Sequence, residues 1–568
     1  MTDVEFEEKL FVEERADYID EETIKNNTIH SGEFFDKIHS ALISPGIKLI
    51  VGPRGCGKTH LMRYAWVECK NDETAPLPIY VSFNKYFKLE PLLKTKPNAI
   101  DLFNKWVLAK ILLSAYEIAC DIEDCEDLDL SSILITNKDF LTKLIIRLEQ
   151  GLSPTFEQDE IVQLISVSSV ISSLSNLCDW LERKRIIILL DDAAISLTPE
   201  YLYEFFDIVR SLKTSRIALK ASVYPGTTEY GPRFHVAHDA ETFDAWISVQ
   251  HPNYSEIMDA IAEARFPDYI SIPNDVKELL KFSAFGIPRS FLMMLRDYQS
   301  TESQTTQQKF NKIIEKYVDL RLSEYSSLKD KLPRLFDVVT LGESLLLKVV
   351  DLLKENNIHS KDEKQVIIGI EKNDNVYFSR LIKMLIETGL FYNLTDISHG
   401  DGRVYERYIP HYALLIKERV FSEGSRGFSP SQVVQKILNK NTKHPVRRSV
   451  SSLFNAEQLT RLKLTLPPCN NCKSLRLTEN QKFCHHCGNQ LIDESAYNQC
   501  MSIPLSKVPL LTSWQVQKLS GLEKVKTIGD VLLLQDPGSE LRKIHRVGPK
   551  IANKIMDKVL SHVEEFLS

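Results

Sequence analysis

Gly52-Pro53-Arg54-Gly55-Cys56-Gly57-Lys58-Thr59 lies between a short apolar run, KLIV at 48–51, and an amphipathic stretch, HLMRYAWVEC at 60–69. This order predicts a buried strand, a glycine-rich turn and a helix. The residues satisfy the pattern G-x-x-x-x-G-K-[ST] in full, in the strand-to-helix setting that the pattern requires. The sequence therefore predicts a loop that surrounds a phosphate group.

Each residue type in this loop has a physical role. Glycines leave room for backbone N–H groups to curl around an anion, and the start of the following helix favours negative charge. Lys58 should reach the β- and γ-phosphates of a nucleotide, and the Thr59 hydroxyl should hold Mg²⁺. The candidate residues for binding ATP and Mg²⁺ are Gly52, Gly55, Gly57, Lys58, Thr59 and His60.

A second motif is the apolar run IIILL at 186–190, which ends in Asp191-Asp192. A buried strand that delivers carboxylates to its carboxyl end is the form expected beside a bound nucleotide. The alternative is that the two Asp only cap the next helix.

Apolar runs and helical patterns alternate over the first 250 residues. Besides 48–51 and 186–190, apolar runs occur at 79–83 and 217–223. This alternation predicts an α/β domain with a parallel sheet that helices cover on both faces. The helical patterns lie at 101–119, 138–149, 160–182 and 200–212.

From about residue 252 the strand-like runs stop, and three helices are expected at 254–265, 274–284 and 287–298. Gly286-Ile287-Pro288-Arg289 opens the third of them. Taken in order, the phosphate loop, the Asp pair and this G-x-P-R stretch resemble the motifs of AAA+ ATPases. The likeness is to the origin-recognition-complex-like and transposition-regulator types in particular, and it covers about residues 30–300.

The resemblance implies roles for single residues. Asp191 would organise the Mg²⁺ shell, and Asp192 would orient the attacking water. Arg289 would touch the γ-phosphate and report its loss as movement of a helical lid, although a surface Arg after a helix-starting Pro is the alternative. Ser222 could position the water from the next strand, or it could be an ordinary residue at a strand end. Arg233 is a candidate finger for a neighbouring subunit.

Asp192 departs from the common AAA+ pattern, which has Glu at this place. The Asp side chain is one methylene shorter, so hydrolysis could be slow. The chain could equally be a nucleotide switch that resembles STAND ATPases, which often carry paired Asp.

Residues 305–425 are expected to be mostly helical, and they end with a helix (FSRLIKMLIETG), a strand (FYNL), a tight turn and a second strand. This order resembles a winged-helix domain with a wing tip at 399–402, though unrelated small domains share it. Residues 422–451 contain Gly, Ser, Pro, Asn and the basic run KHPVRRS, which predicts a mobile, positive linker. The expected plan is a P-loop α/β domain at 1–250, a helical lid at 251–300, a helical, winged-helix-like domain at 301–421, a basic linker at 422–463, a zinc ribbon at 464–495 and a helix-hairpin-helix domain at 505–568.

The zinc ribbon is expected from two C-x-x-C knuckles eleven residues apart. Two such pairs complete the tetrahedral thiolate shell that Zn²⁺ prefers, and four protein ligands leave no open position for water, so the site should be structural. His485 and His486 are expected to face solvent because the cysteines already fill the shell. The segment resembles zinc ribbons, which contact DNA, RNA or protein. The candidate ligands are Cys469, Cys472, Cys484 and Cys487.

Residues 541–557, LRKIHRVGPKIANKIMD, resemble a helix-hairpin-helix motif, whose turn presents backbone N–H groups to a DNA phosphate. The family usually has Gly where this chain has Arg546, so either the turn is altered or the guanidinium itself meets the phosphate. The alternative is a helical module that docks onto a protein. The candidate DNA-binding residues are Lys543, Arg546, Gly548, Lys550 and Lys554.

Charge and composition place the polynucleotide at the carboxyl end. The 568-residue chain has a net charge of −7, yet residues 421–568 hold 21 Lys/Arg against 12 Asp/Glu. A cation-rich tail favours nucleic acid. The acidic N-terminus and the absence of a long apolar run predict an intracellular, cytoplasmic protein without a membrane segment.

Together these features predict an ATPase that engages DNA through its C-terminal region, alone as a homo-oligomer or in a complex with partner proteins. The alternative is a signalling switch in which ATP sets the state and the C-terminal modules sense a protein or nucleic-acid trigger.

Overall fold

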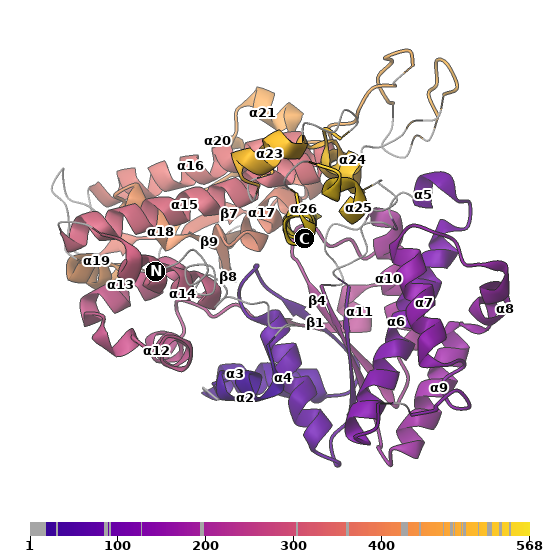
Figure 1. Cartoon of the computed structure of the whole chain (residues 1–568). Helices are drawn as coiled ribbons and strands as arrows, with labels where there is room; N and C mark the ends of the chain where they lie inside the picture. Colours follow the sequence, from indigo (N-terminus) through magenta and orange to yellow (C-terminus); the bar gives the residue numbers. More distant parts are fainter. Residues whose placement is uncertain are drawn as a thin grey trace.

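The computed structural model places its buried apolar side chains in three cores, each built from one continuous part of the chain. They span residues 24–245, 246–462 and 500–563, and we call these parts the sheet unit, the middle unit and the C-terminal unit (Figure 1). The structure describes residues 19–29, 32–83, 89, 92–126, 128–192, 198–302, 305–358, 363–400, 402–421, 430–441, 445–469, 471–477, 481, 483–489, 491, 496–508, 511–519, 525–532, 537–544 and 547–567.

The sheet unit is built on a five-stranded parallel sheet in the order β2-β3-β4-β1-β5. Every residue of β3 and β4 is buried. Successive strand residues face opposite sides, so both faces of the sheet are covered, as the apolar runs predict. Because β4 lies between β1 and β3, the carboxyl ends of these strands meet at one edge. The strands are β1 (Ile47–Val51), β2 (Leu77–Ser82), β3 (Ile186–Asp191), β4 (Ile217–Val223) and β5 (Ala240–Asp244).

The helices of the sheet unit confirm the four predicted patterns, with one difference. The stretch expected at 160–182 is broken near residue 165, because Ser166 caps the helix that follows it. The helices are α2 (Glu21–Asn26), α3 (Gly32–Ile43), α4 (Lys58–Asn71), α5 (Leu92–Thr95), α6 (Ala99–Ile122), α7 (Lys138–Glu149), α8 (Phe156–Leu164), α9 (Val167–Trp180), α10 (Pro199–Leu212) and α11 (Val236–Asp239).

The middle unit joins the three lid helices to the helical segment after them in one core. The sequence favours a separate lid, but Phe285, at the end of the second lid helix, packs its ring 4.8 Å from His411 and 5.1 Å from Tyr412. Its helices are α12 (Tyr254–Arg265), η4 (Tyr269–Ser271), α13 (Asn274–Ala284), α14 (Pro288–Ser300), α15 (Thr306–Lys331), η5 (Pro333–Leu335), α16 (Phe336–Ile358), α17 (Val376–Glu387), α18 (Tyr412–Lys417), α19 (Pro430–Leu438), α20 (Val450–Leu453) and α21 (Ala456–Arg461).

A four-stranded sheet in the order β11-β7-β9-β8 closes the middle unit. Helix α17, Gly389 at φ +75° and the antiparallel pair β8–β9 follow one another as the sequence predicts. The turn between the two strands contains Gly400 and Gly402, while Asp401 lies outside the described residues. The strands are β6 (Lys364–Gln365), β7 (Ile368–Glu371), β8 (Phe391–His399), β9 (Arg403–Pro410), β10 (Lys440–Asn441) and β11 (Val446–Arg448).

The stretch expected to be a linker contains ordered elements in its described part. Helix α19 buries Val433, Val434 and Ile437 in the core of the middle unit. Strand β11 pairs in parallel with β7, so Val446 lies opposite Ile368. The basic and small residues dominate the composition here, but three apolar side chains at helical spacing are enough to hold the segment in place.

The C-terminal unit is a small helical body that contacts the middle unit through α22 and α15. Its helices are drawn in yellow in Figure 1. Its core includes Leu541 and Val547, next to the predicted hairpin turn, and Ile555 and Val559 on the last helix. The elements are α22 (Ala496–Ser502), η6 (Leu505–Lys507), α23 (Ser513–Leu519), α24 (Ile528–Leu532), α25 (Pro537–Arg542) and α26 (Pro549–Leu567).

Among the described residues no single helix has both the length and the apolar character to cross a membrane. Gln158–Leu164 and Val167–Trp180 meet that test only as a pair, and they are bent by 77°.

Candidate functional site

The glycine loop connects the carboxyl end of β1 to α4, which begins at Lys58. Gly55 and Gly57 have φ values of +87° and +100°, which side chains disfavour. A Cβ on Gly55 would lie 3.1 Å from the Cβ of Arg289 and 3.2 Å from Cγ2 of Ile287. Glycine is therefore needed both for the turn and for the close approach of the lid.

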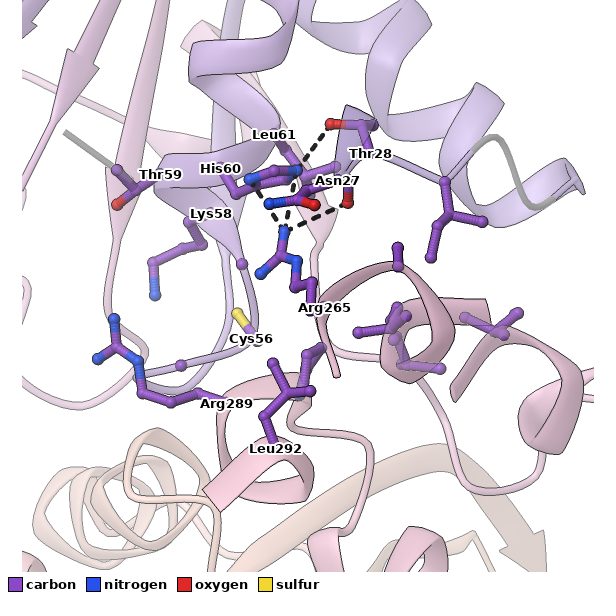
Figure 2. A pocket seen from close by; sticks show the side chains of 18 of the residues that line it. Asn27, Thr28, Cys56, Lys58, Thr59, His60, Leu61, Arg265, Arg289 and Leu292 are labelled. Atoms are coloured by element: carbon purple, nitrogen blue, oxygen red, sulfur yellow. Dashed lines mark hydrogen bonds between the residues drawn. The ribbon is translucent and has the colours of Figure 1, made fainter. Parts of the chain in front are cut away.

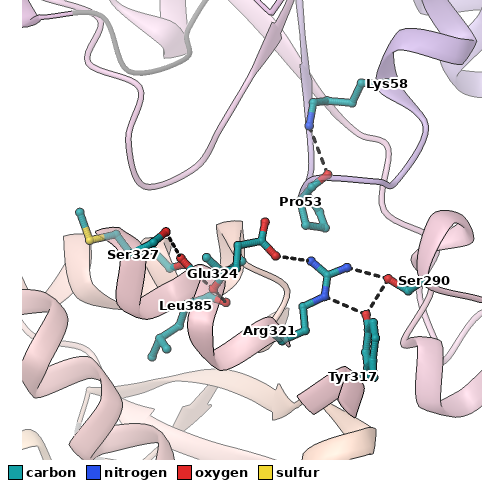
Figure 3. Close-up of polar contacts among 10 residues, drawn as sticks. Pro53, Lys58, Ser290, Tyr317, Arg321, Glu324, Ser327 and Leu385 are labelled. Atoms are coloured by element: carbon teal, nitrogen blue, oxygen red, sulfur yellow. Dashed lines mark hydrogen bonds and ion pairs between the residues drawn. The ribbon is translucent and has the colours of Figure 1, made fainter. Parts of the chain in front are cut away.

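Lys58 is buried at the start of α4. Its Nζ donates to the carbonyl oxygens of Gly52, at 2.7 Å, and Pro53, at 3.2 Å, and the second bond is drawn in Figure 3. The same ammonium lies 4.0 Å from the centroid of the Tyr224 ring. Tyr224 follows β4 directly, and no motif in the sequence indicated it.

The two acidic residues lie at the end of β3, one strand away from β4. Asp191 accepts a hydrogen bond from Tyr80 Oη through Oδ2 at 3.0 Å. Among the described residues its other oxygen, Oδ1, is buried without a hydrogen-bond partner. A carboxylate oxygen in that condition suits Mg²⁺ or a water of its shell, so this donor fits the expected ion.

Asp192 has φ +51°, an uncommon conformation for a residue with a side chain. Its N–H donates to Ser222 Oγ at 2.9 Å. Ser222 is fully buried, and its hydroxyl fixes the backbone of the acidic pair. Asp192 and Tyr224 line the cavity described below.

Arg289 reaches the phosphate loop through the backbone of α14. Its N–H donates to the carbonyl oxygen of Gly55 at 3.3 Å. The preceding turn depends on Gly286, whose φ is +77° and whose N–H donates to Tyr254 Oη at 2.9 Å. The G-x-P-R stretch therefore lies beside the phosphate loop, as the motif order predicts.

A cavity of about 400 Å³ runs from the phosphate loop to a polar cluster at its other end. In this cluster His60 Nε2 lies 2.7 Å from Thr28 Oγ1, and Arg265 Nη2 lies 3.1 Å from each ring nitrogen of His60 (Figure 2). Burial, together with the charge of Arg265, lowers the pKa of His60 to about 3, so the ring is neutral near pH 7.

The walls of the cavity come from three distant parts of the chain. The segment before β1 contributes Thr28 and Phe35, α4 contributes His60, and the lid contributes Arg265 and Leu292. Of these, sequence reasoning named only His60. The others follow no local motif, and their place in the site arises from tertiary packing alone.

Arg233 lies away from this cavity in the turn-rich segment after β4. Its side chain is 72% exposed, and its Nη1 is 2.9 Å from Asp207 Oδ2 in the same chain. An exposed guanidinium beside a single carboxylate is weakly held, so it is accessible to another molecule.

The four predicted zinc ligands lie together, with sulfur atoms all within 4.8 Å of one another. Cys469 Sγ is 3.5 Å from Cys487 Sγ, and Cys472 Sγ is 3.4 Å from Cys484 Sγ. A tetrahedral shell with Zn–S bonds of about 2.3 Å has S···S edges of about 3.8 Å, so the cluster is compatible with zinc.

The two knuckles have the same backbone form. Lys473 and Gly488 directly follow the second cysteine of their knuckles, with φ values of +60° and +68°. Each donates its N–H to the carbonyl oxygen of the first cysteine, at 2.8 Å and 2.9 Å. His485 and His486 are exposed, as predicted.

The lysines predicted to meet DNA surround the turn before α26. Lys543, Lys550 and Lys554 are exposed, and Lys543 pairs with Glu540 on α25. Gly548 is also exposed, and a Cβ there would meet no atom of the described chain within 4 Å. Arg546 lies outside the described residues.

Comparison with known proteins adds one match. The family model described as ORC-CDC6-like matches residues 9–374, well over half of the chain, including the phosphate loop, the acidic pair and the lid. A search of curated proteins finds no match.

Proposed function

Because the chain belongs to the ORC-CDC6-like family, an AAA+ ATPase family, we propose that it binds ATP with Mg²⁺ in this cavity and couples the nucleotide state to engagement of DNA. The observation that carries the proposal is the convergence on one cavity of the phosphate loop, Asp192 and Arg289. Glycine backbone, a carboxylate beside the loop and a lid cation are the groups that phosphoryl transfer requires.

We propose that the phosphates of ATP lie along the loop and that the adenosine extends toward the His60 cluster. Lys58 would exchange its carbonyl partners for phosphate oxygens, which are stronger acceptors because they are charged. Thr59 and Asp191 would hold Mg²⁺, which would supply positive charge beside the phosphates. Arg289 would approach the γ-phosphate from the lid.

The proposal also includes hydrolysis of the bound ATP. Asp192 would orient the attacking water, and its backbone is fixed by Ser222 rather than by the nucleotide. We expect Asp192→Asn to bind ATP with nearly unchanged affinity and to lose turnover, measured as released phosphate. Turnover equal to the wild-type chain would remove Asp192 from the reaction.

The test of ATP binding is calorimetry with Lys58→Ala. Losing one or more charged hydrogen bonds of about 1.5–3 kcal/mol should weaken ATP roughly 10- to 150-fold. Lys70→Ala is the matched control, because Lys70 lies at the other end of α4 and pairs with Glu21 and Asp121. Equal ATP binding by Lys58→Ala and Lys70→Ala would refute the site.

For DNA we propose contact through the C-terminal unit, supported by the exposed lysines at the turn before α26. Binding should weaken steeply with salt, by about 0.9 in log K per log unit of salt for each phosphate contact. Replacing Lys543, Lys550 and Lys554 together by Gln should lower affinity and flatten this slope. The control replaces Lys507, Lys518 and Lys526 of the same unit, and equal losses in both variants would argue against a defined surface.

Two further modules support a DNA-engaging reading. We propose that α17 with β8 and β9 is a winged helix and that the cysteine cluster is a structural zinc ribbon. We also propose assembly into a homo-oligomer or a complex with partner proteins, in which the exposed Arg233 would enter a neighbouring site. Arg233→Ala that leaves the ATPase activity of the assembled protein unchanged would remove the last of these ideas.

The second candidate is a nucleotide switch resembling STAND ATPases, favoured by the paired Asp191 and Asp192 and by the large helical insertion at 101–180. Turnover measured with and without duplex DNA separates the two functions. Stimulation by DNA supports the DNA-dependent ATPase, whereas retained nucleotide with negligible turnover supports the switch.

A further inference from the structure

The loop after β4 is held by the middle unit as well as by its own sheet. Glu387, at the end of α17, accepts hydrogen bonds through Oε2 from the N–H groups of Gly226 and Thr227, both at 2.8 Å. Its other oxygen accepts from Thr227 Oγ1 at 2.9 Å. One carboxylate therefore binds two successive amides and a hydroxyl on a segment 160 residues away.

The loop also packs closely against α17 at Gly226. A Cβ on Gly226 would lie 2.7 Å from the backbone nitrogen of Met384 and 2.8 Å from its Cα, so the loop packs directly on the backbone of α17. One turn earlier on this helix, Arg380 forms an ion pair of 2.7 Å with Glu229. The hydrogen bonds of Glu387 and the ion pair of Arg380 thus hold the loop against one face of α17.

The other end of this loop lies at the phosphate site. Tyr224 faces the Lys58 ammonium, and its N–H donates to Thr228 Oγ1 at 3.0 Å, which closes the turn. A movement of the Tyr224 backbone therefore acts on the same short turn that contains Gly226 and Thr227. Those are the groups that Glu387 holds.

A second connection runs within the middle unit, from the lid helix α14 to α15 (Figure 3). Arg321 on α15 donates to Ser290 Oγ at 2.6 Å, to Tyr317 Oη at 2.8 Å and to Glu324 Oε2 at 2.8 Å. Ser290 is the residue after Arg289. Both sides of the phosphate site, the β4 loop and the lid helix, are thus tied to the core that contains α15 and α17.

We propose that Glu387 is a positioning residue that couples the phosphate site to α17, by holding the 224–228 loop so that Tyr224 stays against Lys58 until phosphate draws the lysine away. This inference rests on the proposed binding of ATP. When ATP binds, the tyrosine loses its cation partner, the loop shifts, and the shift passes through the carboxylate to α17 and β8.

The test is hydrogen exchange of residues 376–391 with and without saturating ATP, together with calorimetry to show that ATP is bound. In the wild-type chain ATP should change exchange in this segment, and in Glu387→Ala it should not. Coupling between sites typically changes affinity by about 5- to 150-fold. Because Glu387 holds the arrangement that competes with phosphate for Lys58, Glu387→Ala should also bind ATP at least about fivefold more tightly.

Two variants separate positioning from general damage. Glu387→Gln keeps an oxygen that accepts both amides, so it should restore the ATP-dependent change. Glu343→Ala removes an ion pair with Lys329 elsewhere in the middle unit and should behave as the wild-type chain does. If Glu387→Ala does not fold, Thr227→Val removes only the hydroxyl contact and should reduce the change.

The outcomes are distinct. If the wild-type chain fails to bind ATP, the proposed function fails. If it binds ATP and residues 376–391 do not respond, or if Glu387→Ala responds as strongly as the wild-type chain, the coupling through Glu387 is refuted while ATP binding stands.

Discussion

Gly286→Ala tests how the lid reaches the phosphate loop. A Cβ at this position would lie 1.9 Å from the carbonyl oxygen of Ile247, and the backbone is in the left-handed region at φ +77°. An ordinary C···O contact is about 3.3 Å, so the turn must move by more than about 1 Å. The left-handed backbone adds a cost of about 1–2 kcal/mol for any side chain. Arg289, three residues later in the chain, should be displaced together with this turn.

Gly46→Ala is the matched control, because Gly46 has φ +85° and no atom of the described chain lies within 4 Å of its Cβ position. Gly46→Ala should lose about 1–2 kcal/mol in the free energy of unfolding by urea, and Gly286→Ala should lose more because it also overlaps the Ile247 carbonyl. Only Gly286→Ala should also weaken ATP in calorimetry, by about 10- to 100-fold, since a misplacement of about 1 Å can cost that much at a site. Equal ATP affinities in the two variants would refute the reasoning.

Three further predictions concern stability and metal. Burial lowers the pKa of Lys220 to about 7, so between about pH 7 and 10 the unfolded chain binds one proton more than the folded chain. The free energy of unfolding should therefore rise with pH by up to about 1.4 kcal/mol per pH unit in this range. Lys220→Met should lack this part of the rise in urea unfolding. Elemental analysis should find zinc bound to the wild-type chain and to Cys125→Ser but not to Cys472→Ser, and zinc in the last would exclude the thiolate shell. In urea unfolding, Arg321→Met should lower the free energy of unfolding by about 3 kcal/mol, since it breaks a buried network. Arg461→Met, at an exposed pair with Asp337, should lose less than about 1 kcal/mol in the same measurement.

The parts of the site that local sequence could predict are those whose chemistry sits on consecutive residues. The phosphate loop at 52–59, the acidic pair and the G-x-P-R stretch each need only a few neighbours in the chain to be recognised. The C-x-x-C knuckles are similar, because the left-handed residue after each pair follows from the knuckle itself. The parallel sheet was predictable because buried strands in such sheets are apolar on both faces.

The rest of the site depends on packing between distant segments. Thr28, Tyr224, Arg265 and Glu387 carry no motif, and each meets its partner only after the strands and helices are assembled. Ser222 shows the same limit from the other side. The sequence left open whether it positions a water or is an ordinary strand-end residue, and in the structure its Oγ accepts a hydrogen bond from the backbone N–H of Asp192.

Composition misled at 422–463 for a physical reason. Gly, Ser and Lys indicate a mobile segment, yet α19 buries Val433, Val434 and Ile437 against the lid side of the core. A short amphipathic helix is difficult to distinguish from a linker by composition, because its apolar residues are few and their effect depends on the surface that receives them.

The shared core of residues 246–462 has a practical consequence for anyone who shortens this protein. A truncation at residue 300 would separate α13 and α14 from α15, α18 and α19. It would expose a broad apolar surface, so the fragment should aggregate. A truncation near residue 465 leaves that apolar surface buried. Because the lid helices share this core, any movement of the lid relative to the sheet would carry α15, α18 and α19 with it, and the two cores divide between Ala245 and Trp246.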